Sequence, residues 1–114
     1  MRVYFLVPGL LLIAGAALAV PQPDGHGIVE QGSAGGAPAC VSCHGPQLQG
    51  NDAIHAPAIA GKPAPFIVAR LDHYASPAGH NPLMKQVASA LSEAERQAVA
   101  SYISHLPPKP STAQ

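Results

Sequence analysis

One short segment of this chain combines residue types that can do chemistry, with Cys40 and Cys43 three positions apart and His44 directly after them. Residues at this spacing lie on one side of a helical turn. Two thiols presented in this way can form thioether bonds to the vinyl groups on one edge of a porphyrin, and the next imidazole can bind the iron. The spacing C-x-x-C-H therefore predicts one covalently attached haem c, held by Cys40 and Cys43, with His44 as an axial ligand.

Other chemistry is open to a C-x-x-C pair, namely a redox dithiol, half of a zinc site or a local disulfide. A thioredoxin-like dithiol lies at the start of a βαβ unit, and no strand pattern precedes Cys40. A structural zinc site needs about four ligands, and the chain has no cysteine besides these two. We therefore favour haem attachment over these alternatives.

A haem bound by His44 on one face has a sixth coordination position on the other. Met84 is the candidate ligand, because it follows a proline-containing loop about 40 residues after His44 and the other methionine is Met1. A thioether ligand raises the reduction potential, and a saturated iron favours electron transfer over catalysis. An open sixth position and a second histidine are the alternatives. The histidines in question are His26, His55, His73, His80 and His105.

The N-terminal residues have the pattern of a secretory signal. Arg2 is followed by an apolar run from Val3 to Val20, and its small-residue end predicts cleavage at Ala19/Val20. We expect residues 1–19 to be removed on export to the periplasm. An uncleaved membrane anchor is the alternative, because the run approaches spanning length. Export agrees with the motif, since haem c is attached outside the cytoplasm.

The rest of the sequence predicts one small domain, residues 20–108, and a disordered tail, residues 109–114. The chain has no Trp, and aromatic residues make up only 4% of it. A domain this small gains little from burial alone, so a porphyrin would supply the apolar body that its side chains lack. The formal net charge is +0 at pH 7, and without a basic patch we expect no nucleic-acid partner.

Helical patterns account for most of the domain, and no strand pattern or internal repeat is found. A short helix capped by Asp24 is expected to run to about residue 31, and a second helix follows Pro63. A third short helix is expected over residues 84–91. The clearest helix begins with a capping box at residues 92–95 and ends before Pro107. The sequence thus predicts an all-α domain.

The motif, the segment 56–61, the loop 81–84 and the C-terminal helix together resemble class I cytochrome c. The chain is most similar to the small exported bacterial cytochromes with one haem. The resemblance extends over nearly all of the domain and implies the class I cytochrome c fold, with several short helices around the haem. It implies a one-electron carrier in an exported electron-transport chain rather than an enzyme. A single C-x-x-C-H motif leads us to expect any second haem domain on another chain.

The resemblance also implies roles for residues outside the motif. The backbone carbonyl of Pro57 would accept a hydrogen bond from the free ring nitrogen of His44, which orients the imidazole. The N- and C-terminal helices would cross, with Gly27 and Tyr102 at the contact. Residue spacing alone predicts neither the Pro57 hydrogen bond nor this helix contact.

The partners implied are redox proteins that dock briefly at the exposed haem edge, mainly through apolar contact. A membrane is a partner only if the signal segment stays uncleaved. One alternative is an electron-transfer subunit of a dehydrogenase or oxidase complex. The other is a five-coordinate haem that binds a gas or performs peroxidase-like chemistry, for which Arg70 and His80 are the distal candidates.

Overall fold

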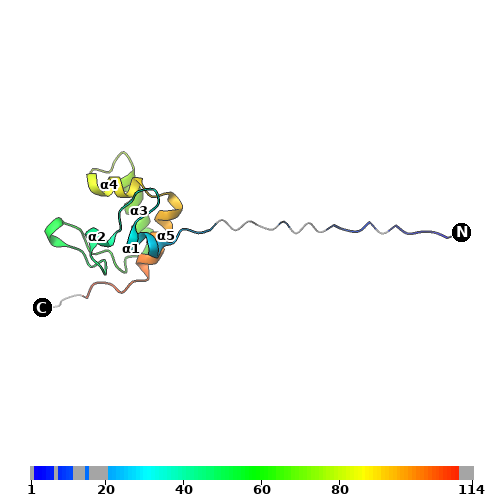
Figure 1. The fold of residues 1–114 in the computed structure, drawn as a ribbon, viewed down its shortest axis with the longest axis horizontal. Helices are drawn as coiled ribbons and strands as arrows, with labels where there is room; N and C mark the ends of the chain where they lie inside the picture. The colour runs from blue at the N-terminus through cyan, green and yellow to red at the C-terminus, as the bar shows by residue number, and fades with distance from the viewer. Residues whose placement is uncertain (1, 7, 12–14, 16–20, 111–114) are drawn as a thin grey trace.

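The computed structural model describes residues 2–6, 8–11, 15 and 21–110, and the described elements are helical (Figure 1). An isolated bridge between Asn51 and Ala56 is the β-type pairing found in this part of the chain. The all-α prediction is therefore confirmed. The elements in order are α1 (Gly25–Gln31), α2 (Val41–His44), the 3-10 helix η1 (Asp52–Ile54), α3 (Ala64–Ala75), α4 (Pro82–Ser89) and α5 (Glu93–Ser104).

Both ends of the chain are described only in part. The predicted cleavage point at Ala19/Val20 lies outside the described residues, as do residues 111–114 of the predicted tail. Within the described residues, no helix has the length and apolar character needed to cross a membrane. The signal segment and the tail stay predictions.

The first and last helices of the domain cross and pack against each other. Gly25 is buried at the contact, and a Cβ added there would overlap the carbonyl oxygen of Ala98 on α5. The prediction that Gly27 lies at this contact was wrong: a Cβ there would meet the side chain of Asp24. The reason is geometric, since two residues along an α-helix turn the side-chain direction by about 200°.

The N-termini of α1 and α5 differ in how they are capped. Asp24 is the N-cap of α1, as expected, but its side chain makes no capping hydrogen bond. Its backbone carbonyl instead accepts from the amide of Ile28 at 3.1 Å. At α5 the predicted capping box is confirmed: Ser92 Oγ accepts from the amide of Glu95 at 3.1 Å, and Glu95 Oε1 accepts from the amide of Ser92 at 2.9 Å.

The core is small and aliphatic in the described part of the chain. Its largest fully buried side chains are Val29, Leu48, Val99 and Ile103. They come from α1, from the loop after α2 and from α5, and α3 adds further buried residues. Helix α3 packs against both α4 and α5. The core therefore connects α1, α3, α4 and α5 to the segment that follows the C-x-x-C-H motif.

Arg96 on α5 connects three helices through its guanidinium. Its Nε and Nη2 donate to the carbonyl oxygen of Ala88 on α4 at 3.1 and 3.0 Å. Its Nη1 forms an ion pair with Asp72 on α3 at 3.2 Å. The Arg96 side chain is only 18% exposed, whereas that of Asp72 is 52% exposed. The bonds to Ala88 are therefore the better shielded part of this link.

We expect Arg96→Gln to lower the free energy of unfolding by about 1.5–3 kcal/mol, the range for hydrogen bonds made by charged groups. Asp72→Asn removes only the exposed ion pair and should cost less than about 1 kcal/mol. Guanidinium unfolding followed by circular dichroism measures both losses. Equal losses in the two variants would show that the ion pair, not the bond to α4, holds the helices together.

Candidate functional site

Helix α2 presents both thiols and the imidazole of the motif from a single turn. The amide of His44 donates to the carbonyl of Cys40 at 3.0 Å, which closes that turn. Both cysteines are free, with Cys40 partly buried against the core and Cys43 exposed. A local disulfide, one of the alternatives for this motif, is therefore absent from the described structure.

Burial raises the pKa of the Cys40 thiol to about 11. Desolvation is the main cause, because an apolar environment penalises the charged thiolate. The nearby Cys43 adds to the increase, while a backbone hydrogen bond partly opposes it. Below that pH, Cys40 is a neutral, apolar group rather than a redox-active thiolate or a ready zinc ligand.

Among the described residues, His44 has a polar side chain that is buried, with 8% of its surface exposed. Its Nδ1 lies 2.8 Å from the carbonyl oxygen of Pro57. A carbonyl can only accept, so Nδ1 is a donor here, and Nε2 is the nitrogen left to bind a metal when the ring is neutral. A neutral imidazole oriented in this way is the usual form of a histidine metal ligand. The hydrogen bond implied by the resemblance is present, and the ligand role of His44 stays a prediction.

The segment after α2 folds back and fixes the position of Pro57. The carbonyl of Leu48 accepts from the amides of Ile59 and Ala60 at 2.9 and 3.2 Å. Asn51 and Ala56 exchange two backbone hydrogen bonds of 2.8 and 3.0 Å. These hydrogen bonds involve residues just before and just after Pro57. They therefore fix the Pro57 carbonyl against the segment that follows His44.

Leu48 was not recognised from the sequence as part of this support. Its side chain is almost fully buried, and its backbone has φ of 52°, which a non-glycine residue rarely adopts. Burial of the leucine side chain offsets the cost of that conformation. An isolated leucine in a loop between glycines and prolines carries no sequence signal for such a role.

Met84 lies in the first turn of α4, which starts two residues before the start at Met84 that the sequence predicts. The helix begins at Pro82, and the side chain of Asn81 accepts from the amide of Met84 at 3.1 Å. Asparagine at an N-cap followed by proline at N1 is a helix-start signal that the sequence contained. The Met84 side chain is partly buried against the core, whereas the preceding Leu83 is 72% exposed.

The alternative histidine ligands lie at the surface. The ring of His26 packs beside Tyr102 with centroids 5.0 Å apart, and Nδ1 of His105 is hydrogen-bonded to the carbonyl of Ser101 at 2.7 Å. The others, His55, His73 and His80, are exposed. No group of three or more His, Cys, Asp or Glu side chains in the described part of the chain could hold a bare metal ion.

The site residues fit a porphyrin-bound iron better than a bare ion. Iron in a porphyrin needs only one or two protein ligands, and His44 offers an oriented nitrogen. Within the motif, Cys40 and Val41 are apolar groups that pack on the core but stay partly exposed, and the side chain of Met84 is in the same state.

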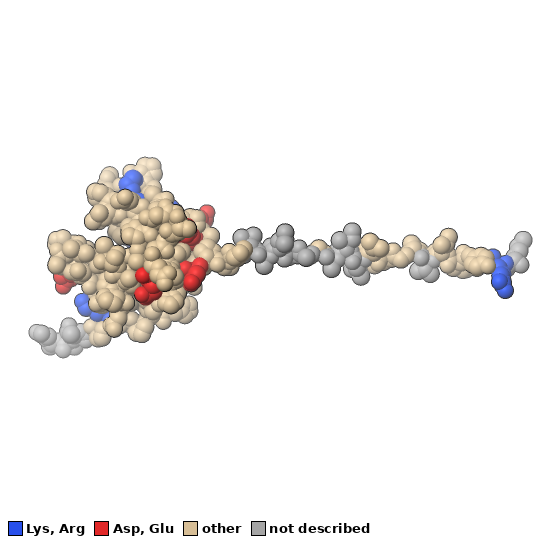
Figure 2. Space-filling model, viewed as in Figure 1, with Lys and Arg blue, Asp and Glu red and all other residues tan. Residues whose placement is uncertain are grey.

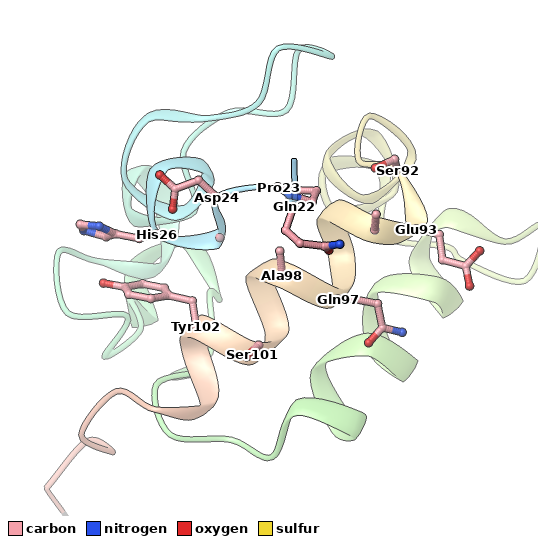
Figure 3. A pocket seen from close by; sticks show the side chains of 12 residues that line it. Gln22, Pro23, Asp24, His26, Ser92, Glu93, Gln97, Ala98, Ser101 and Tyr102 are labelled. Atoms are coloured by element: carbon pink, nitrogen blue, oxygen red, sulfur yellow. The ribbon is translucent and has the colours of Figure 1, made fainter. Parts of the chain in front are cut away.

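An open pocket of the described structure lies elsewhere, between the start of α1 and α5 (Figure 3). Its labelled side chains include Asp24, His26, Glu93 and Tyr102. Neither cysteine, His44 nor Met84 lines it. This open groove therefore has no part in the chemistry of the motif.

A family model described as Cytochrome c matches residues 29–107. The chain belongs to the cytochrome c family. Haem c is the covalent cofactor of this family, and the single attachment motif of the sequence provides for one haem. The expected class I cytochrome c fold is confirmed by solved structures. That of Acidithiobacillus ferrooxidans cytochrome c4 is similar at a TM-score of 0.68 and 34% identity, over 72% of this chain and 48% of that one.

Two further similar proteins have names that mention thiosulfate dehydrogenase. The thiosulfate dehydrogenase electron acceptor of Stutzerimonas stutzeri (strain A1501) is 40% identical over 85 residues, 74% of this chain and 39% of that protein. The thiosulfate dehydrogenase from Marichromatium purpuratum has a TM-score of 0.71 at 27% identity, over 79% of this chain and 20% of that one. The chain spans less than half the length of each of these relatives.

Proposed function

We propose that the protein is a one-electron carrier with one haem c, attached through Cys40 and Cys43 and ligated by His44 and Met84. The observation that carries the proposal is the state of His44. This buried imidazole donates from Nδ1 to Pro57, which leaves Nε2 as the nitrogen for iron, on the same helical turn as two unpaired thiols. Haem supplies a one-electron iron couple when bound.

The chain's own residues have separate tasks in this proposal. Cys40 and Cys43 hold the porphyrin edge, and Cys43 reaches solvent while Cys40 lies against the core. Pro57 keeps the His44 ring in one orientation, so little reorganisation accompanies a change of charge. Met84, restrained by its helical turn, would fill the remaining position and leave no room for substrate, which favours a carrier over an enzyme.

The proposed docking face surrounds the exposed Cys43. Residues 41–51 include no Lys, Arg, Asp or Glu, and the next segment adds the exposed Asp52 and the largely exposed Ile54. Figure 2 shows scattered Lys and Arg on its face of the molecule and several Asp and Glu toward the side where the N-terminal segment joins the domain. A surface with so few charges favours brief, apolar docking whose rate depends little on salt. We place this exchange in the periplasm, with the N-terminal segment as the export signal.

A second candidate is an electron-acceptor subunit of a dehydrogenase complex. It is favoured by the relative named as a thiosulfate dehydrogenase electron acceptor and by the similar thiosulfate dehydrogenase structure. The haem chemistry is the same in both candidates. A subunit would copurify from its host in a stable complex, whereas a free carrier would not.

Absorption spectra of the exported protein, oxidised and reduced, test the proposal together with a pyridine haemochrome assay and the mass of the mature chain. We expect covalent haem c, a low-spin spectrum and a methionine–iron band. A high-spin ferrous form that takes up carbon monoxide readily would favour the five-coordinate alternative. A colourless, folded chain without added mass would refute the proposal.

A further inference from the structure

Gly50 lies between the two parts of the chain that position the His44 ring. Its amide donates to the carbonyl oxygen of His44 at 2.7 Å, so it is tied to the end of α2. It is followed by Asn51, which pairs with Ala56, the residue before Pro57. Gly50 therefore touches both the backbone of the histidine and the strand-like segment that supplies the histidine's hydrogen-bond acceptor.

This position has no room for a side chain. A Cβ on Gly50 would lie 2.7 Å from the amide nitrogen of Ala58, 2.9 Å from the carbonyl oxygen of Ala56 and 3.0 Å from the carbonyl carbon of Pro57. All three are backbone atoms, which cannot rotate away as the end of a flexible side chain can. The carbonyl carbon belongs to the same group that accepts the hydrogen bond from His44 Nδ1.

We propose that Gly50 is a positioning residue for the axial histidine, because the absence of its side chain sets how closely the Pro57 carbonyl approaches His44. The proposal deepens the proposed function and rests on ligation by His44. A larger residue at position 50 must displace the peptide at Pro57 and weaken the hydrogen bond to Nδ1. Weaker acceptance of the Nδ1–H by the Pro57 carbonyl makes the imidazole a poorer electron-pair donor to iron, which destabilises the ferric form and raises the reduction potential.

Gly36 offers a matched control for the backbone cost of the substitution. Its φ of 98° resembles the 91° of Gly50, so alanine is strained to a similar degree at both positions. A Cβ on Gly36, however, has no heavy atom within 4 Å. Only the contact with the segment at Pro57 distinguishes the two substitutions.

The experiment compares Gly50→Ala with Gly36→Ala in the haem-loaded protein. The readouts are the reduction potential and the proton resonance of His44 Nδ1–H in the diamagnetic ferrous state. We expect Gly50→Ala to raise the potential, shift that resonance and speed its exchange with solvent. Gly36→Ala should leave all three as in the unsubstituted protein and lose only the stability that its positive φ costs. The pair Gly50→Asn and Gly36→Asn repeats the test with a residue that tolerates positive φ better.

The outcomes separate this proposal from the proposed function. If the unsubstituted protein shows no histidine-ligated haem, the proposed function fails. If it does, but the Gly50 variants match the Gly36 variants in potential and in the Nδ1–H resonance, only the positioning role of Gly50 is overturned. Failure of both Gly50 variants to fold with haem, while both Gly36 variants fold, would also overturn it, because the contact would then serve folding alone.

Discussion

Met84→Ala is expected to abolish the methionine–iron absorption band and to lower the reduction potential. Alanine has no donor atom, and loss of a thioether ligand removes the preference for ferrous iron that this ligand provides. The fall should be a sizeable part of the roughly 0.8 V range over which axial ligands set haem potentials. Visible spectroscopy and a redox titration of the purified protein measure the two effects.

Leu83→Ala is the matched control for this substitution. Leu83 precedes Met84 in the first turn of α4 and is 72% exposed, so its truncation leaves the helix start intact without touching the proposed ligand. Both band and potential should be unchanged. Survival of the band in Met84→Ala would disprove the assignment of Met84 and turn attention to His80, which precedes Met84 in sequence.

Gly25→Ala is expected to destabilise the domain by about 1–3 kcal/mol, the usual cost of inserting a methyl group where no space exists. The added Cβ would overlap the carbonyl oxygen of Ala98 on α5, a backbone atom that moves only if the two helices separate. For a domain of this size each kcal/mol corresponds to roughly 4–8 °C in Tm. Thermal unfolding followed by circular dichroism gives the shift.

Gly27→Ala tests the same helix from its other side. A Cβ on Gly27 meets only the side chain of Asp24, whose exposed carboxylate can rotate away. Alanine is a better helix former than glycine by up to about 1 kcal/mol, so Tm should stay the same or rise. If Gly27→Ala lowered Tm more than Gly25→Ala, the crossing point would be misplaced in the structure.

The sequence was most informative where a property is local. The spacing of Cys40, Cys43 and His44 depends only on the geometry of one helical turn, and that turn is present as expected. The capping box at Ser92 and the helix that follows also depend on neighbours in the chain. The start of α4 is local as well, but its signal, Asn81 before a proline, is also typical of the loop that the sequence predicts there.

The hydrogen-bond acceptor for His44 is not a local feature of the sequence. Only the resemblance to a known family suggested Pro57. The hydrogen bond joins residues 13 positions apart, and no pattern of residue types encodes such a distance. Residue type does not encode the roles of Leu48 and Gly50 either, because packing against other segments sets their backbone conformations. Sequence reasoning missed both, since loops rich in glycine and proline look alike before they fold.

The sequence by itself therefore determined the cofactor and the helical class and predicts the points of attachment, because residue type and short spacing specify these. Only the tertiary structure decided which glycine allows α1 and α5 to cross and which backbone atoms hold the His44 ring in place. The physical reason is that close approach of two backbones depends on the direction of each Cα–Cβ bond. That direction is set by the packing of segments distant in sequence.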